Sequence, residues 1–447
     1  MKTRTFDVAL IGGGLSGLSA AVELARLGAT VILLERARHF GGRAYSFRES
    51  VTGDIIDNGQ HVMMGCYRAT RRYLKIIQSE DQCTLQPSLH IDFLQPLRQN
   101  GALHCVNIPA PMHVVSGLLR FNVLSVTDRI KLLYVIKEIL VSSRSKERVL
   151  DSMTVDQWLT SLNQSSDSRK YLWDVITVGA LNNHPQNVSA LMLFRVLKAA
   201  FLGRKENASL LLPRKGLSEI LVDPAIEYIK EHGGIALAEQ GVTSVQSNSV
   251  NAQALVMDDG TTIHAKTFIS AVPWYEYHRL VPSERKTIER FSPSPIISIH
   301  IWFDRKVTDL EFAALITTRL QWMFNKSRTE YSADGKTRQH YSFVLSGAEE
   351  FIGMSKEKLI KIARDDLYSV LPDAKAARII HTKVIKEKRA TFIPSPGLEI
   401  NRPKAPSHLQ NLFLAGDWTA TGYPATIEGA IQSGCTAAKL AAHYLKK

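Results

Sequence analysis

The sequence predicts an α/β fold in which a Rossmann-like dinucleotide-binding domain is interleaved with a second domain of the α+β class. Three observations predict this fold. An apolar run over residues 6–11 leads into a glycine turn and then into helical periodicity. A second apolar run, over residues 29–34, ends in the acidic residue Glu35. Strand-like segments recur at 235–273 and 411–417, which indicates that the chain returns to the first domain.

The glycine turn has the spacing G-x-G-x-x-G, formed by Gly12, Gly14 and Gly17. Gly12 permits the tight turn, Gly14 lets backbone N–H groups approach a pyrophosphate, and Gly17 lets helix and strand pack closely. Glu35 lies 18 residues after Gly17, where a carboxylate that binds ribose belongs. The alternative is a glycine-rich turn with a surface glutamate, but the order of strand, turn, helix and acid favours a dinucleotide site.

The composition predicts a globular protein with more than one domain. The 447 residues are 45% hydrophobic and 22% charged, and a net charge of +13 fits an anionic membrane surface, an acidic substrate or nucleic acid. Nucleic acid is the weakest of these partners, because the chain has no zinc-ligand spacing and no polybasic run. The four cysteines form no C-x-x-C pair, so we expect reduced thiols in the cytoplasm. We expect neither a signal peptide nor a transmembrane helix.

Two polar segments follow the first domain's opening unit. The turn Gly41-Gly42-Arg43 places backbone N–H groups and a guanidinium where they can reach a pyrophosphate, although a plain turn with a solvated arginine has the same sequence. The cluster Asp57-Asn58-Gly59-Gln60-His61 suits a loop that lines a site. A hydrogen-bonded turn around Asp57 is the alternative, and the sequence leaves both open.

The next part of the chain predicts a helix at 62–80, strand-like pieces at 85–106, and then mostly helices. Two of these, within 112–141, are amphipathic and basic, and another at 187–203 is strongly apolar. They either pack on the core of the second domain or face a membrane or lipid channel.

The chain then returns to the first domain through several predicted strands. Residues 252–265 read as a hairpin around the turn 258–260, and 266–273 as a separate strand that proline ends. Further on, His300 and Trp302 share one face of a predicted strand, as pocket or core residues. The last unit is a strand ending in Gly416-Asp417, followed by a loop and a helix beginning near Ala425, which is again an anion and ligand site.

The glycine turn with Glu35, the Gly-Gly-Arg turn, the hairpin and the Gly-Asp strand end together resemble the FAD-dependent amine oxidase and phytoene desaturase superfamily. The resemblance implies a glutathione-reductase-like FAD-binding domain at 1–80, 210–275 and 391–447, and an amine-oxidase-type substrate domain at 81–209 and 276–390. It implies FAD as cofactor and no metal. The residues that it assigns to FAD are Gly12, Gly14, Leu15, Ser16, Gly17, Glu35, Arg36, Gly42, Arg43, Gly59, Gln60, His61, Val242, Gly416, Asp417, Ala425, Thr426 and Ile427.

Residues 57–67 and 415–430 look more specifically like the squalene-associated branch, the hydroxysqualene dehydroxylases of bacterial hopanoid synthesis. Amine oxidases more usually carry small residues where this chain has Gln60-His61, and they place an aromatic cage beside the flavin, of which Tyr423 could form only one wall. The resemblance implies reduction of hydroxysqualene to squalene with loss of water. A carotenoid desaturase, an amine oxidase, and a lipid-carrying chaperone of the GDP-dissociation-inhibitor type are the alternatives.

That reaction requires a proton donor for the leaving hydroxyl, a hydride donor and the exclusion of water. His61 is the candidate acid, Gln60 would orient flavin or substrate, and Tyr423 could relay a proton. Asp57 would hold the loop or set the histidine tautomer, and His61 could also only pack against the flavin. The expected partners are hydroxysqualene, an electron donor such as NADPH or a reductase, and the anionic inner face of the membrane.

Overall fold

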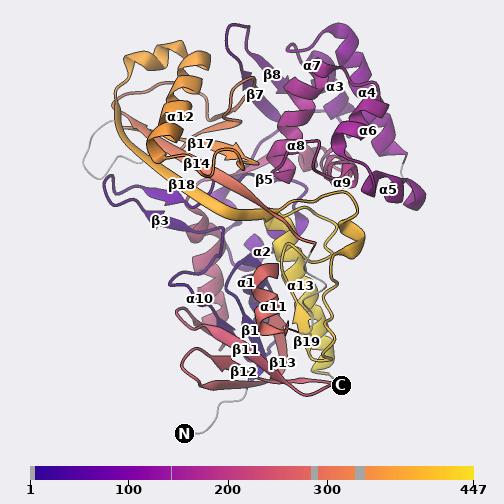
Figure 1. Cartoon of the computed structure of the whole chain (residues 1–447), viewed down its shortest axis with the longest axis vertical. Helices are drawn as coiled ribbons and strands as arrows, with labels where there is room; N and C mark the ends of the chain where they lie inside the picture. Colours follow the sequence, from indigo (N-terminus) through magenta and orange to yellow (C-terminus); the bar gives the residue numbers. More distant parts are fainter. Residues whose placement is uncertain (1–5, 142, 283–289, 328–337, 447) are drawn as a thin grey trace.

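The computed structural model describes residues 6–141, 143–282, 290–327 and 338–446. Two large sheets organise it (Figure 1). One lies with α1, α10 and α13 in the lower part of the view, and the other lies with α12 in the upper part, beside a group of helices. The proposed domain division places the first sheet in the FAD-binding domain and the second sheet in the substrate domain.

The first sheet has the strand order β10-β2-β1-β13-β12-β11, with β19 paired to β13. Successive side chains of β1 enter opposite cores: Val8 and Leu10 lie in the core shared with α1, α10 and α13, and Ala9 and Ile11 in the core that contains Trp274 of α11. The bounds are β1 Phe6–Ile11, β2 Val31–Leu34, β10 Ile235–Leu237, β11 Val242–Ser247, β12 Ala252–Met257, β13 Thr262–Ser270, β19 Leu412–Leu414, α1 Leu15–Arg26, α10 Asp223–Glu231, α11 Trp274–Leu280 and α13 Ile427–Tyr444.

Strand β13 corrects one sequence-based expectation. The second arm of the predicted hairpin and the separate strand after it are one continuous strand, Thr262–Ser270. Its first half pairs antiparallel with β12, and its second half runs parallel to β1 and β19. Because the two halves have different partners, the burial pattern changes from alternating to continuous along the strand, which the sequence shows as two segments.

The second sheet has the order β18-β14-β17-β16-β15-β7-β8. On β14, Ile297, Ile299 and Ile301 enter the core shared with α12. The alternate side chains, His300 and Trp302 among them, belong to the opposite face. The bounds are β7 His90–Leu94, β8 Gly101–His104, β14 Pro293–Phe303, β15 Phe312–Leu315, β16 Trp322–Asn325, β17 Gln339–Ser346, β18 Ile379–Phe392 and α12 Lys356–Val370.

A group of helices lies at the upper right in Figure 1, across from α12. It shares one core with strands of the second sheet. The predicted helical stretch 112–141 is two helices, separated at the buried Phe121. The bounds are α3 Met112–Arg120, α4 Val126–Leu140, α5 Arg144–Asp151, α6 Val155–Ser161, α7 Ser166–Ser168, α8 Asp174–Leu181 and α9 Ala190–Phe201.

Short strands connect the two large sheets. The expected helix at 62–80 is shorter than predicted, because it starts at Arg68 and is preceded by the strand β5. Strand β5 pairs with β9, so residues 63–64 serve a sheet and are unavailable to a helix. The bounds are β3 Ser46–Arg48, β4 Ile55–Asp57, β5 Met63–Met64, β6 Cys83–Leu85, β9 Leu210–Pro213 and α2 Arg68–Ile76.

Candidate functional site: a cofactor cradle between two helix N-termini

The glycine turn joins β1 to α1 with no room for side chains. Gly12 has φ +99°, a conformation that favours glycine, and its N–H donates to the carbonyl of Leu34 over 2.8 Å. A Cβ on Gly17 would lie 1.9 Å from the carbonyl oxygen of Gly12. The close helix–strand packing that the spacing predicts is therefore present.

Helix α1 starts at Leu15, its N-cap residue Gly14 provides no side-chain cap, and its first turn contains no acidic residue. Gly14 faces Gly42 so closely that a Cβ on Gly42 would lie 3.2 Å from the Gly14 Cα. Two glycine backbones thus meet at the N-terminus of the helix that carries Leu15, Ser16 and Gly17. This arrangement offers N–H groups and a positive dipole end to a phosphate.

Glu35 directly follows β2 and contacts the glycine turn. Its carboxylate accepts hydrogen bonds from the N–H groups of Gly13 over 2.6 Å and Ala37 over 2.8 Å. The N–H of Gln240 donates to the Glu35 carbonyl, which brings the segment leading to Val242 alongside. The guanidinium of Arg36 pairs with Glu276 at the surface over 3.0 Å.

Arg43 and Asp417 form a partly buried ion pair that joins residues 374 positions apart in the chain, with the arginine side chain 31% exposed and the carboxylate 6% exposed. The guanidinium donates to Asp417 Oδ2 over 2.7 Å and to the carbonyl of Ala390 over 2.5 Å. Burial alone lowers the pKa of Arg43, but the Asp417 carboxylate outweighs it and raises the pKa. The arginine is therefore a permanent cation at this corner.

Arg402 is a residue that sequence reasoning missed, and it holds the loop after Asp417. The buried guanidinium donates to the carbonyls of Asp417 and Tyr423, both over 2.6 Å, and to that of Trp418 over 3.3 Å. Its charge is balanced by Glu399 over 2.8 Å. No motif surrounds Arg402 in the sequence, so only the fold shows that it shapes this loop.

Helix α13 points a second N-terminus toward the same region. Thr426 is its N-cap and accepts a hydrogen bond from the N–H of Gly429 over 3.1 Å, and Ala425 precedes it. Gly416, with φ +145°, donates from its N–H to Ser433 in this helix. The loop that follows β19 and the first turns of α13 are thereby fixed to each other.

The loop Asp57–His61 is anchored through Asp57. This carboxylate accepts hydrogen bonds from Ser46 over 2.7 Å, from the N–H of Leu217 over 2.9 Å, and from Lys326 over 3.1 Å. Burial raises the pKa of Asp57, but these partners outweigh it and lower the pKa. Since Lys326 follows β16, the bond also ties the loop to the second sheet. The turn-anchoring role and a site-lining loop are therefore compatible.

The candidate catalytic residues His61, Gln60 and Tyr423 are all uncharged at neutral pH. The Nδ1 of His61 lies 2.7 Å from the carbonyl of Gly59, which fixes a tautomer with the proton on Nδ1. Burial lowers the pKa of His61, so the imidazole is neutral at neutral pH. Burial raises the pKa of Tyr423, so the phenol keeps its proton. The side-chain amide of Gln60 donates to the carbonyl of His61 over 3.5 Å, and among the described residues Tyr423 makes no hydrogen bond to His61.

His300 and Trp302 form a cluster with His340. The sequence predicts that His300 and Trp302 share one strand face, but it does not predict that His340 joins them. His300 Nδ1 lies 2.9 Å from His340 Nε2, and Trp302 stacks on His340 with ring centroids 4.0 Å apart. Trp302 donates from its indole N–H to Asp54 over 2.5 Å. Burial lowers the pKa of His300 to about 3, so it is neutral. Both residues are buried, as the core interpretation predicts.

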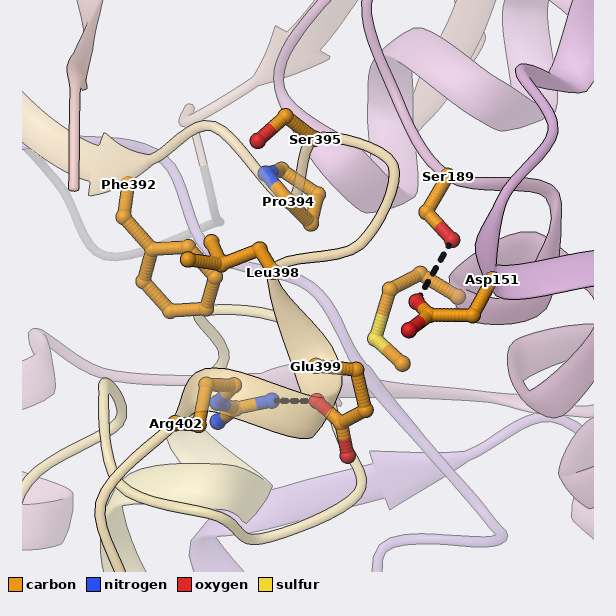
Figure 2. Close-up of a pocket in the computed structure, with 9 residues that line it drawn as sticks. Asp151, Ser189, Phe392, Pro394, Ser395, Leu398, Glu399 and Arg402 are labelled. Atoms are coloured by element: carbon orange, nitrogen blue, oxygen red, sulfur yellow. Dashed lines mark hydrogen bonds and ion pairs between the residues drawn. The ribbon is translucent and has the colours of Figure 1, made fainter. Parts of the chain in front are cut away.

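A second cluster of polar residues, near Arg402, surrounds a small pocket (Figure 2). Glu399 pairs with Arg402 on one side and with Arg195 of α9 over 2.7 Å on the other. Across the pocket, Ser189 lies 3.4 Å from Asp151. The pocket is too narrow to admit a water molecule. These contacts therefore connect the helices to the Arg402 segment and do not form a ligand site.

Comparison with known proteins identifies the family. A family model of flavin containing amine oxidoreductases matches residues 15–442. This chain belongs to that family. The enzyme is 27% identical to 15-cis-phytoene desaturase of Synechococcus elongatus over 96% of this chain and 94% of that one. It is also 27% identical to hydroxysqualene dehydroxylase of Sinorhizobium fredii, over 97% of this chain and 98% of that enzyme.

A solved structure confirms the fold of this flavin-containing oxidoreductase. Cyclohexylamine oxidase from Brevibacterium oxydans superimposes with a TM-score of 0.73 at 16% identity, covering 99% of this chain and 100% of that one. The predicted fold class and FAD as cofactor are therefore confirmed, and the chain is an FAD-dependent oxidoreductase. The uncapped start of α1 and the opposed glycines Gly14 and Gly42 fit the pyrophosphate of FAD.

Within the described ranges, no helix is long and apolar enough to cross a membrane. Over the same residues, no His, Cys, Asp and Glu side chains gather in a group of three or more that could hold a metal ion.

Proposed function

We propose that this enzyme reduces hydroxysqualene to squalene with loss of water. The observation that carries the proposal is the end-to-end match to a hydroxysqualene dehydroxylase, which covers 97% of this chain and 98% of that enzyme. The loop with Gln60 and His61, which resembles the same branch, supports it. The domain division and the cofactor contacts expected from the sequence are part of this proposal.

A phytoene-type desaturase is the second candidate. The 15-cis-phytoene desaturase of Synechococcus elongatus is 27% identical to this chain, the same identity as the hydroxysqualene dehydroxylase. Both candidates take a long apolar isoprenoid. An amine oxidase is less well supported, since none of the described aromatic ring pairs involves Tyr423, the expected wall of an amine cage. The two isoprenoid reactions differ in direction: a desaturase removes hydride from its substrate, and a dehydroxylase adds hydride to it.

FAD, when bound in its reduced form, supplies the hydride for the carbon that loses its hydroxyl. The C–O bond breaks, a C–H bond forms, and the hydroxyl takes one proton and leaves as water. We propose NADPH or a reductase as the source of the two electrons. The protein must then orient the hydroxyl, deliver the proton and keep solvent away from the allylic carbon.

In this proposal His61 orients the hydroxyl and delivers the proton. With Nδ1 bonded to Gly59, the neutral ring presents Nε2, which accepts a hydrogen bond from the substrate hydroxyl. Protonation of Nε2 turns this acceptor into the acid. The phenol of Tyr423, protonated because burial raises its pKa, is the second donor. Gln60 orients flavin or substrate.

The exposed side of α3 and α4 supports the proposed membrane contact. Val126, Ile130 and Tyr134 are 68%, 53% and 48% exposed, and Arg120 and Lys137 are exposed nearby. Apolar side chains beside basic ones suit the interface of an anionic bilayer, where an uncharged isoprenoid resides. We therefore place the enzyme at the inner face of the membrane. Liposome binding that does not weaken with added salt would contradict this placement.

The deciding experiment is a single anaerobic turnover. Purified enzyme is reduced with dithionite, hydroxysqualene is added, and the flavin absorbance near ~450 nm is followed while extracted lipid is analysed. We expect the absorbance to return and squalene to form. If the flavin stays reduced and no squalene forms, hydroxysqualene is not the substrate. Bleaching of the oxidised enzyme by phytoene would then support the desaturase.

The pH dependence of this turnover tests His61. Because burial lowers the pKa of His61 below its ordinary 6.5, the imidazolium is a minor form at neutral pH. We expect the rate to rise as the pH falls through that lowered pKa. Replacing the residue in His61→Gln should lower the rate about 100-fold and remove this rise. A variant that keeps the rise would exclude His61 as the acid, and its unchanged flavin spectrum is the control.

A further inference from the structure

A hollow of about 360 Å³ opens beside the N-terminus of α2, outside the residues assigned to FAD. Its volume is within the range of small-ligand sites, about 300–1,000 Å³. Three of its five lining residues are arginines. The lining residues are Gly65, Arg68, Arg71, Arg204 and Asn207.

Two backbone segments run so close together that they bring these arginines into one hollow. The N–H of Gly65 donates to the carbonyl of Ser209 over 2.8 Å, and the N–H of Cys66 to that of Asn207 over 3.1 Å. A Cβ on Gly65 would lie 1.8 Å from the carbonyl oxygen of Glu206. Arg204, on the second segment, therefore shares the hollow with the arginines of α2.

The charges of the hollow are only partly balanced by the protein. Arg71 lies 3.5 Å from Glu80, which also lies 3.6 Å from Lys75. In the described part of the chain, Arg68 and Arg204 form no ion pair. The nearby carboxylate of Glu428 is bound to the N–H groups of residues 69 and 70, over 2.9 Å each. Three guanidinium groups thus line the hollow, and among the described residues Glu80 is the one carboxylate paired with any of them.

We propose that this hollow binds the phosphate group of an anionic ligand. Guanidinium groups bind phosphate oxygens with paired hydrogen bonds, and a phosphate between them removes their mutual repulsion. The buried Asn207 also lines the hollow, and its side-chain amide donates to the carbonyl of Leu202 over 2.8 Å. Hydroxysqualene carries no charge, so the proposed substrate does not account for three arginines. The site is therefore an addition to the proposed reaction and does not depend on it.

The hollow is close to the candidate catalytic residues. Gly65 follows His61 by four residues. Burial raises the pKa of Tyr423, and Arg68 is near enough to oppose that rise. On the other side, Lys205 donates a hydrogen bond to Asn107, beside the exposed Ile108. The phosphate can thus belong to a lipid headgroup at the apolar surface or to a soluble ligand such as a pyridine nucleotide.

The test measures phosphate binding by the FAD-loaded full chain. One arm titrates inorganic pyrophosphate at low ionic strength by calorimetry. The other measures cosedimentation with phosphatidylcholine vesicles, with and without phosphatidylglycerol. The variant Arg68→Gln/Arg204→Gln is compared with Arg364→Gln/Lys361→Gln, which removes the same charge from exposed positions of α12. We expect the first variant to bind about tenfold more weakly per arginine lost, and the second to bind like the wild type.

Each outcome decides the proposal. Weakened binding of vesicles alone supports the site with a lipid headgroup, and weakened binding of pyrophosphate supports it with a soluble phosphate. Unchanged binding in both arms, or equal loss in the α12 variant, overturns it. If the double variant does not fold, Arg204→Gln alone is measured, because this residue is exposed and its side chain makes no ion pair with described residues. Turnover of hydroxysqualene in detergent is a separate measurement, so failure of the proposed function does not affect this result.

Discussion

The glycine turn and the Arg43–Asp417 ion pair with its loop, which we call the corner, both follow strands of the first sheet or contact its ends, but different forces hold them. The turn is built from residues adjacent in sequence, and its shape depends on the absence of side chains at Gly12 and Gly17. The corner joins residues 374 positions apart through a charge pair, and Arg402 fixes the loop beside it with several hydrogen bonds.

The difference shows which kind of change each region tolerates. At Gly12 and Gly17 an added Cβ would meet backbone atoms, which cannot move aside as a flexible side chain can. The corner contains side chains that can shift, but its charges are buried and require partners. A larger residue should therefore damage the turn, whereas loss of a charge should damage the corner.

The largest expected effect comes from adding atoms to the turn. In Gly17→Val, the Cβ would meet the Gly12 carbonyl oxygen at 1.9 Å. We expect a loss of about 5 kcal/mol or more and no FAD-loaded protein. Gly353→Val is the control, because no atom lies within 4 Å of its Cβ position. Recovery of flavin absorbance in the Gly17 variant would show that steric exclusion does not shape the turn.

A somewhat smaller effect is expected at the corner. Arg402→Met keeps the apolar stem but leaves Glu399 and the carbonyls of Asp417 and Tyr423 without their donor. We expect the free energy of unfolding to fall by about 3–5 kcal/mol and FAD to dissociate more readily. Chemical denaturation and flavin release measure both. If Arg364→Met, at an exposed site, has an equal effect, the buried contacts are not the cause.

A third change tests the charge that ties the Asp57 loop to the second sheet. The pKa of Asp57 is below its ordinary 3.8, so its contribution to stability is full at neutral pH and is lost as the pH falls through the lowered pKa. Asp57→Asn should cost about 2 kcal/mol at pH 7, and the difference from wild type should shrink in acid. Denaturation at both pH values measures it. Asp365→Asn, at a surface pair, should change stability by less than about 0.5 kcal/mol.

Sequence reasoning succeeded where function depends on residues close together in the chain. The strand, turn and helix around Gly12 to Gly17 are in the predicted elements, and Glu35 directly follows β2 as expected. The last strand is present but shorter than predicted, because it ends at Leu414 and Asp417 lies in the loop after it. Each has a local signature, such as glycine spacing or an apolar run that ends in a polar residue. The resemblance to the flavin-containing family rests on these same signatures.

The remaining parts could not be predicted, because their partners are distant in sequence. Nothing near Arg402 shows that its guanidinium meets the carbonyls of residues 417–423. The contact of Lys326 with Asp57 depends on how the second sheet lies against the first domain. The hairpin error has a similar cause, since one strand changes neighbours partway along its length. The three arginines of the hollow are also brought together only by the fold.

Glu428, near the start of α13, accepts hydrogen bonds from the first N–H groups of α2. Helix α13 also packs on α1, where a Cβ on Gly434 would lie 2.1 Å from the carbonyl oxygen of Ser16. Helix α13, from the last part of the sequence, thus packs directly on α1 and α2, from the first part. During synthesis, the core that α13 shares with α1 and α10 cannot close until α13 has been made, so we expect FAD to bind only after this helix has emerged from the ribosome. A ribosome stalled before residue 427 should hold a chain that binds no flavin.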